Sequence, residues 1–427
     1  MNMLKGWVLG KEQNIKRNSV IWNALGGAFN AGQSAIILIF ISYRQGLTVA
    51  GMVIIAYAVA NLFLSICKYG IRNYQVTDVR DRFTFSDYFY CRCGTALLTL
   101  GLFFIYLAFC FILRDYTVEK GVILFEVTIL KLLDAFEDVY IGRYQQVGRL
   151  DIGAKIMAVR LFLSTVLICI MVLAGADIYI SLLGGIISSI ILDIYLIKST
   201  FGVTQTVISG FQWNSEWKLL KICLPLCIGI TLSIYIGNVP KYMIDAYMDE
   251  EVQAIFGYIM MPVFVITLLN QFIYQPMVKD LGDIWEKGDK KEFNRSVRRQ
   301  CLIVTGLTVV VIVAGLLLGL PVLSVLYNVD LTAYQKEFAV LLLGGGFYAM
   351  AYYLNVPITT IRKQNYIAIG YVAAAILSVL FGKYFVLAQG MLGAAVLYLC
   401  LNALLVMVYS VILAVGVKKN GLTDIDF

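Results

Sequence analysis

Polar and basic side chains recur along one side of an apolar stretch near the N-terminus. Steps of four, four, three and four residues separate Tyr57, Asn61, Ser65, Lys68 and Arg72. This spacing places all five on one face of an α-helix. A helix surrounded by lipid has no need of such a face, whereas a helix that lines a wet, positively charged cavity does. The stripe therefore predicts an aqueous cavity within a membrane protein.

Three other apolar stretches carry similar polar stripes. They consist of Asn23, Asn30 and Ser34; of Thr231, Tyr235, Asn238, Tyr242 and Asp245; and of Tyr348, Tyr352, Asn355, Thr359 and Arg362. Hydrogen bonds between helices, worth about 0.6 kcal/mol each, explain any single stripe equally well. Four stripes together favour a shared cavity. Tyrosines and amides suit sugars, because they offer apolar ring faces and hydrogen-bond partners for hydroxyl groups.

Ionisable side chains inside apolar helices require an explanation, because placing a charge in a membrane is unfavourable in free energy. Arg160 and Asp193 fall at similar depth in two antiparallel helices, so a structural ion pair is one explanation. Lys68, Arg72 and Arg362 fall at helix ends, where topology alone explains them. The helix predicted over 120–141 holds Glu126, Lys131 and Asp134, followed by Glu137 and Asp138 near its cytoplasmic end.

The composition is that of a helical membrane protein. The chain of 427 residues is 60% hydrophobic and 14% charged, whereas a soluble domain has about 45–50% apolar and ~25% charged residues. Apolar blocks of about 20 residues alternate with short polar runs. We predict an all-α fold of twelve transmembrane helices at 19–42, 48–69, 88–113, 120–141, 153–175, 178–198, 217–239, 252–275, 299–320, 337–357, 365–386 and 391–415.

Lysine and arginine are distributed unevenly between the two sides of these helices. With a cytoplasmic N-terminus, the segments on that side hold 26 of them and the opposite loops hold six. The positive-inside rule therefore predicts a multi-pass protein with both termini in the cytoplasm. The cytoplasmic connection at 276–298 looks like a basic interfacial helix, for which attraction to anionic lipids is a sufficient explanation.

The chain also looks duplicated. A six-helix bundle at 1–198 is followed by a cytoplasmic linker at 199–216 and a second six-helix bundle at 217–427. An even number of helices per half makes the repeats parallel, with a pseudo-twofold axis along the membrane normal. We expect the central cavity to lie around this axis.

No pattern typical of an enzyme is present in the sequence. The chain has no histidine, which removes histidine-based acid–base catalysis and most zinc sites. Its nine cysteines include no Cys-x-x-Cys pair, and phosphate-binding glycine loops and nucleophile elbows are absent. We expect no enzymatic activity, no cofactor, no metal and no nucleic-acid partner.

Several stretches resemble one transporter family. They are RNSVIWNALGGAFNAGQSAI at 17–36, KYGIRNYQVTDV at 68–79, IGRYQQVGRLDIGAKI at 141–156 and GNVPKYMIDAYMDEEVQAIFGYIMMP at 237–262. With the twelve-helix plan, they resemble the bacterial polysaccharide-transport flippases of the multidrug/oligosaccharidyl-lipid/polysaccharide exporter superfamily. The resemblance implies two six-helix bundles around a cavity in the bacterial cytoplasmic membrane. It also implies export of a polyprenyl-pyrophosphate-linked oligosaccharide repeat unit for capsule, exopolysaccharide or O-antigen assembly, with a polysaccharide polymerase or glycosyltransferases as partners.

This function assigns roles to the residues above. The pyrophosphate needs cations, for which we predict Lys68, Arg72 and Arg362 at the cytoplasmic side and Lys131 and Arg160 deeper in the cavity. The sugar is predicted to contact Asn23, Asn30, Tyr57, Asn61, Tyr235, Asn238, Tyr352 and Asn355. The alternative is a cation-coupled multidrug and toxin antiporter of the same superfamily. Such a protein usually places a carboxylate on its first or seventh helix within the cavity. The first predicted helix has none, and the seventh has only Asp245, beyond its outer end.

Overall fold

The computed structural model describes residues 2–10, 14–78, 82–206, 210–274 and 278–419. Its regular elements in these ranges are all helical, as predicted. They are α1 (Asn2–Leu9), α2 (Ile15–Arg44), α3 (Gly46–Lys68), α4 (Ile71–Thr77), α5 (Phe85–Leu113), α6 (Val118–Gln146), α7 (Leu150–Leu173), α8 (Ile178–Thr200), η2 (Phe201–Thr204), α9 (Trp213–Tyr247), α10 (Glu250–Tyr274), α11 (Val278–Glu286), α12 (Lys290–Ala314), η4 (Gly315–Gly319), α13 (Leu320–Tyr327), η5 (Thr332–Tyr334), α14 (Gln335–Thr360) and α15 (Gln364–Lys419).

Each of the twelve predicted membrane helices has a counterpart among these elements. Within the described ranges, ten helices are long and apolar enough to cross a membrane. The heavily charged α6 is not among the ten, and α15 counts once although it covers the last two predicted helices. Gly390, with φ 59° and ψ −133°, interrupts α15 in a conformation that only glycine adopts readily. The chain is therefore a multi-pass membrane protein.

Several helix boundaries differ from the predicted ones. α9 extends at both ends beyond 217–239, and α12 begins at Lys290 and continues through the π-helical turn η4 into α13. The predicted interfacial helix is thus divided between α11 and the start of α12, and its residues 276 and 277 lie outside the described ranges. α3 ends at Lys68, because Tyr69 and Gly70 both adopt the left-handed conformation. Arg72 therefore lies on the short helix α4, and the prediction that it continues the helical face of Tyr57 is wrong.

The chain forms two compact units, Met1–Thr231 and Leu232–Phe427, which are here called unit 1 and unit 2. The boundary falls within α9. Leu219 and Cys223, in the first part of α9, are fully buried in a core cluster with Ile71 and Tyr88 of unit 1. This packing explains why the division lies beyond the predicted linker at 199–216.

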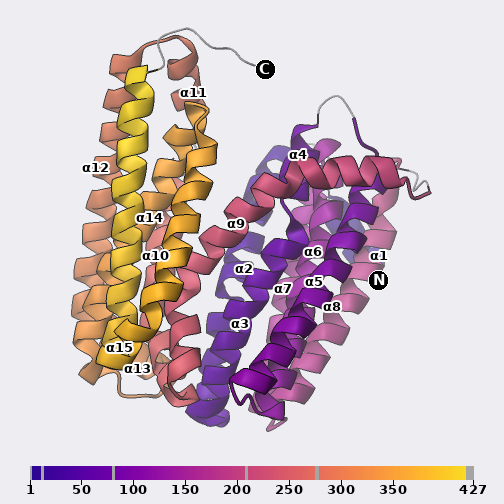
Figure 1. Cartoon of the computed structure of the whole chain (residues 1–427). Coiled ribbons are helices and arrows are strands. Elements are labelled where there is room, and N and C mark those ends of the chain that lie inside the picture. The colour runs from indigo at the N-terminus through magenta and orange to yellow at the C-terminus, as the bar shows by residue number, and fades with distance from the viewer. Residues whose placement is uncertain (1, 11–13, 79–81, 207–209, 275–277, 420–427) are drawn as a thin grey trace. The chain divides into compact units, whose positions relative to one another are not determined.

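In unit 1, α2 packs along α7 and α3 packs along α6 (Figure 1). α3 is the most enclosed membrane helix, because nearly every side chain from Ala50 to Cys67 is buried or half-buried. Hydrogen bonds fix the starts of its neighbours: Thr84 and Asp87 form a capping box at α5, and the Thr117 hydroxyl accepts from the Lys120 amide at α6.

In unit 2, α14 packs between α10 and α15. Glycines allow this close approach, since an added Cβ at Gly345 would lie 2.8 Å from Val263 and one at Gly344 would lie 2.7 Å from Tyr398. Gly344 and Gly345 thus serve the close packing of α14 against its neighbours.

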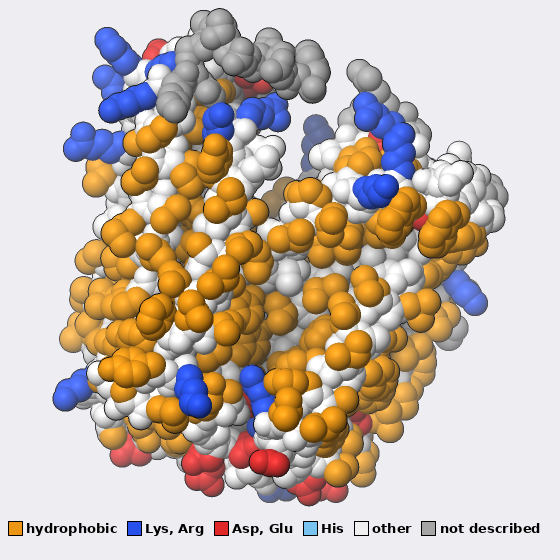
Figure 2. All heavy atoms as spheres, viewed as in Figure 1, with side chains coloured by type: hydrophobic (Ala, Val, Ile, Leu, Met, Phe, Trp, Pro, Cys, Tyr) orange, Lys and Arg blue, Asp and Glu red, His pale blue; other side chains and the backbone are white. Residues whose placement is uncertain are grey.

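Figure 2 shows apolar side chains over the middle of each unit, with lysine, arginine and carboxylates gathered toward the helix ends. Large apolar side chains of α5 and α12 are among the exposed ones, including Leu97, Ile105, Leu302 and Val310. An apolar belt with charged ends is the surface that a bilayer requires.

Candidate functional site

The charges that the sequence places inside the membrane come together around α6 in unit 1. Arg160 of α7 is 1% exposed, and its Nη2 donates to Glu137 Oε2 at 2.6 Å and to Asp134 Oδ1 at 2.7 Å. Its Nε lies 3.4 Å from Asp193 Oδ1 of α8, which confirms the predicted pairing of these two residues. We call Lys131, Asp134, Glu137, Arg160 and Asp193 the Arg160 cluster.

Lys131 is enclosed by hydrogen-bond acceptors at one end of this cluster. Its Nζ donates to Asp134 Oδ2 at 3.0 Å, to Asn30 Oδ1 at 2.8 Å and to Gln33 Oε1 at 3.3 Å. Its side chain is 2% exposed. The three donor positions of the ammonium group are thus filled from α2 and α6. The local pair with Asp134, which the sequence left as the rival explanation, is formed.

A second cluster lies one helical turn farther along α6. Asp138 Oδ1 accepts from Arg72 Nη1 at 3.2 Å and lies 3.8 Å from Lys68 Nζ, while its Oδ2 lies 3.4 Å from Arg92 Nη2. We call these four residues the Asp138 cluster. Arg92 is fully buried, whereas Lys68 and Arg72 are 32% and 24% exposed. Three cations therefore converge on one carboxylate, and two of them reach the surface of unit 1.

The turn between α3 and α4 sets the spacing of the two exposed cations. Tyr69 and Gly70 adopt φ values of 51° and 70°. A Cβ at Gly70 would lie 2.8 Å from Leu226 Cβ of α9, so glycine is required there both by its backbone conformation and by this neighbour. Arg92 also stabilises the turn, since its Nη1 donates to the Cys67 carbonyl oxygen, which the Thr95 hydroxyl also bonds at 2.8 Å.

Counted with every group ionised, the two clusters have opposite net charges. The Arg160 cluster has two cations and three carboxylates, an excess of one negative charge. The Asp138 cluster has three cations and one carboxylate, an excess of two positive charges. An excess of positive charge on partly exposed side chains at the end of a membrane helix suits an anionic ligand.

The remaining predicted residues of unit 1 differ in accessibility. Asn23 is exposed and Asn61 is half-buried, so both side chains reach the surface of the unit. Tyr57 is buried, and its hydroxyl has no hydrogen-bond partner among the described residues. The Lys131 ammonium lies 6.0 Å from the centre of the Tyr57 ring. Tyr57 thus packs beside the Arg160 cluster.

The predicted residues of unit 2 form a separate polar group. The Asn355 amide donates to the Tyr371 hydroxyl at 3.1 Å, and Tyr235 stacks on Tyr242 with its hydroxyl 3.2 Å from Ser378. Asn238 bonds its own helix, and Tyr352 packs half-buried against the core of unit 2. Arg362 is exposed in a left-handed turn that ends α14. Tyr235, Asn238, Tyr352 and Asn355 keep partial exposure, as a cavity lining would.

Sequence reasoning missed two members of these networks. Arg92 falls four residues into the predicted helix at 88–113. A charged side chain one helical turn inside a predicted membrane helix is the feature of the sequence that could have indicated its role in an ion cluster. Gln33 comes three residues after Asn30 of the first polar stripe. It is 1% exposed and bridges Lys131 to Thr165 of α7.

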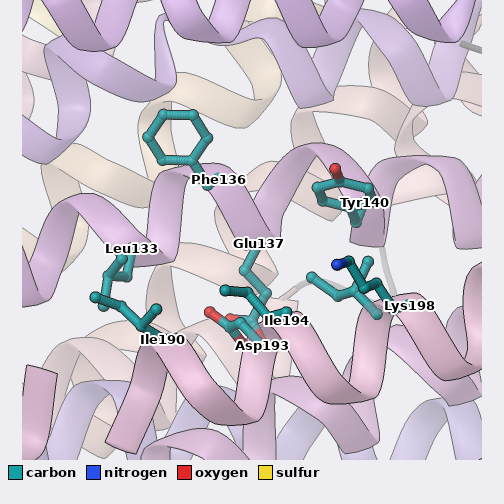
Figure 3. Close-up of a pocket in the computed structure, with 9 residues that line it drawn as sticks. Leu133, Phe136, Glu137, Tyr140, Ile190, Asp193, Ile194 and Lys198 are labelled. Carbon is teal, nitrogen blue, oxygen red and sulfur yellow. The ribbon is translucent and has the colours of Figure 1, made fainter. Parts of the chain in front are cut away.

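A pocket of about 240 Å³ opens between α6 and α8 beside the Arg160 cluster (Figure 3). Glu137 and Asp193 face each other across it, and Lys198 lies farther along α8. The rest of the lining is apolar or aromatic and consists of Leu133, Phe136, Tyr140, Ile190, Ile194 and Ile197. No group of three or more histidine, cysteine or carboxylate side chains suited to a metal ion occurs in the described part of the chain.

No family model matches the sequence, and no curated protein sequence matches it. Solved structures do match. The lipid II flippase MurJ in an inward closed conformation has a TM-score of 0.68 at 15% identity over 91% of this chain and 86% of that chain. An inward-facing multidrug resistance MATE family transporter of the MOP superfamily has a TM-score of 0.61 at 14% identity, with coverage of 92% and 96%. The Vibrio cholerae MATE transporter VcmN in its bent form has a TM-score of 0.60 at 13% identity, with coverage of 95% and 98%. At such identities the likeness establishes the fold.

Proposed function

We propose that this chain, which has the fold of MOP-superfamily transporters, is a flippase for a polyprenyl-pyrophosphate-linked oligosaccharide repeat unit. It moves the unit from the inner to the outer leaflet of the cytoplasmic membrane for surface polysaccharide assembly. The observation that carries the proposal is the positive excess of the Asp138 cluster. One structural neighbour is named a lipid II flippase, which also favours a lipid-borne substrate.

The Asp138 cluster suits a pyrophosphate group. Lys68 and Arg72 are partly exposed, and Asp138 neutralises only one of the three positive charges around it. The Arg72 guanidinium can offer two parallel N–H donors to phosphate oxygens, and Lys68 adds a point charge. On binding, the pyrophosphate exchanges hydrogen bonds with water for hydrogen bonds from Lys68 and Arg72, while the polyprenyl chain stays in the bilayer.

Lys131 and Arg160 enter this proposal as a second step. Both are almost fully buried and bonded to carboxylates of unit 1. A phosphate that reached them would have to replace Asp134 as their partner, so their contact with substrate requires a rearrangement of the Arg160 cluster. The amide side chains of Asn23 and Asn61, which reach the surface of unit 1, would then contact the sugar residues.

The alternative function is a cation-coupled multidrug antiporter, since other structural neighbours are MATE transporters. The two functions separate in proteoliposomes. A flippase would make a fluorescent polyprenyl-pyrophosphate oligosaccharide accessible to a membrane-impermeant lectin and would leave ethidium gradients unchanged. An antiporter would change the ethidium gradient and would leave the oligosaccharide inaccessible to the lectin.

Replacement of both Lys68→Ala and Arg72→Ala tests the role of the Asp138 cluster. We expect at least a tenfold loss of the flipping rate, because each lost charge-assisted hydrogen bond weakens binding by about 1.5–3 kcal/mol. The exposed Lys336→Ala variant serves as control and is expected to keep its rate. Equal rates for the double variant and the control would contradict the proposal.

A further inference from the structure

The pocket between α6 and α8 contains carboxylate oxygens whose charge is not fully balanced. Glu137 is 2% exposed, and its Oε1 has no hydrogen-bond partner among the described residues. Asp193 Oδ1 likewise accepts no hydrogen bond there, although it lies 3.4 Å from Arg160 Nε. The Arg160 cluster as a whole has one more carboxylate than cations. Lys198 also lines the pocket but lies five residues farther along α8 than Asp193, so an additional positive charge beside Glu137 and Asp193 would give these two carboxylates a partner of their own.

The lining decides which kind of cation fits. A bare metal ion takes about six oxygen ligands, whereas this pocket offers two carboxylates and Lys198 in a mostly apolar wall. Its volume of about 240 Å³ also exceeds the share of a single water molecule, about 30 Å³, several-fold. A primary ammonium carried on a larger organic molecule can donate to both carboxylates while its carbon atoms contact the isoleucines.

The surroundings of the pocket indicate how such a molecule arrives. On α8, Ile187, Ile190, Ile191 and Ile194 are 49%, 37%, 61% and 52% exposed. Exposed isoleucines on a membrane helix face acyl chains, so the ligand enters from the lipid phase. Lys198 is exposed at the end of α8, five residues and therefore about 7.5 Å along the helix from Asp193.

We propose that this pocket binds the headgroup of phosphatidylethanolamine. The ethanolamine ammonium donates to Glu137 and Asp193, Lys198 bonds the lipid phosphate, and the acyl chains lie along the exposed isoleucines of α8. The carboxylates lie deeper than Lys198, so the headgroup must bend inward from its phosphate for the ammonium to reach Glu137 and Asp193. Bound lipid would thereby hold α6 and α8 together.

The test measures the melting temperature of the purified full-length protein in mixed micelles during titration with single lipids. We expect a saturable rise with phosphatidylethanolamine and a much smaller rise with phosphatidylcholine, whose trimethylated ammonium has no N–H donor. Phosphatidylglycerol has no cation and is expected to behave like phosphatidylcholine. Lys198→Ala and Asp193→Asn should each weaken phosphatidylethanolamine binding about tenfold, the usual effect of losing one charged hydrogen-bond partner.

Matched controls are Lys336→Ala and Glu119→Gln, because both side chains are exposed and lie outside the pocket. These variants should keep the wild-type lipid titration. Lys198 is itself exposed, so Lys198→Ala remains a fair test even where Asp193→Asn does not fold. Equal responses to the three lipids, or an unchanged titration of Lys198→Ala, would overturn the proposal. A full stabilising effect of Na⁺ or of lowered pH without added lipid would assign the site to an ion or a proton instead.

Discussion

Replacement of Arg160 by methionine should be among the most destabilising single changes in unit 1. The guanidinium contacts Glu137 at 2.6 Å, Asp134 at 2.7 Å and Asp193 at 3.4 Å, and all three carboxylates are at most 13% exposed. Methionine retains most of the apolar length of the side chain but removes the charge. The cluster would then hold three carboxylates and only Lys131 as a cation.

The expected cost follows from the loss of one partner in a buried ion cluster. Such changes typically destabilise by 3–5 kcal/mol, because the remaining charges stay buried without compensation. The free energy of unfolding in mixed micelles, measured by denaturant titration, should fall by about this amount for Arg160→Met. Adding Glu137→Gln should recover a large part of the loss, because it removes one uncompensated carboxylate.

Arg295 provides the matched control. It forms an ion pair with Glu292 at 3.1 Å, but its side chain is 81% exposed. An exposed pair of this kind contributes little, so Arg295→Met should leave the free energy of unfolding nearly unchanged. A loss below about 1 kcal/mol for Arg160→Met, or no recovery in the double variant, would refute the description of the Arg160 cluster as a buried, mutually dependent network.

Three further predictions concern other parts of the chain. The double variant Lys131→Asp with Asp134→Lys should have a much lower melting temperature. The new lysine at position 134 would face Arg160, whose Nη2 now lies 2.7 Å from the Asp134 carboxylate. An unchanged melting temperature would contradict this prediction. Gly393→Ala should also destabilise, because its Cβ would lie 1.8 Å from the Phe385 carbonyl oxygen, whereas Gly101→Ala meets nothing within 4 Å and should be tolerated in the same thermal assay. Single cysteines in a cysteine-free background test the topology in intact cells. The distribution of basic residues predicts that Lys287→Cys does not react with an impermeant thiol reagent and that Lys336→Cys does. The opposite labelling would show that the predicted topology is reversed.

The sequence predicted the helices well because each one is a long apolar block with polar ends. It also predicted the pairing of Arg160 with Asp193, because depth along two antiparallel helices can be counted. The same counting of residues failed at Arg72. The helical spacing from Tyr57 to Arg72 assumed one continuous helix, whereas α3 ends before the left-handed turn at Tyr69 and Gly70. Gly70 directly follows the helix predicted at 48–69, a position where glycine commonly ends a helix in the left-handed conformation, so this turn was within reach of the sequence.

The contacts of Lys131 show a different limit. Its pair with Asp134 is local in sequence and could be predicted from the i+3 spacing. Its bonds to Asn30 and Gln33 depend on how α2 lies against α6, about 100 residues away in the chain. Hydropathy and charge give the depth of a residue but leave its rotation toward a particular neighbour open. The assignment of individual cavity residues to substrate therefore stays a prediction.

The close packing of Gly70 against Leu226 gives α9 control over the geometry of the exposed cations. α9 begins in unit 1, holds the Leu226 side chain against the turn between Lys68 and Arg72, and continues past Thr231 into unit 2 as one uninterrupted helix. Rotation of α9 about its own axis would move the Leu226 side chain away from this turn or push it against Gly70. Such a rotation would change the distance between Lys68 and Arg72, and under the proposed flippase function it would also change how long they retain a phosphate group. The rate of substrate release would then depend on the torsion of a single helix.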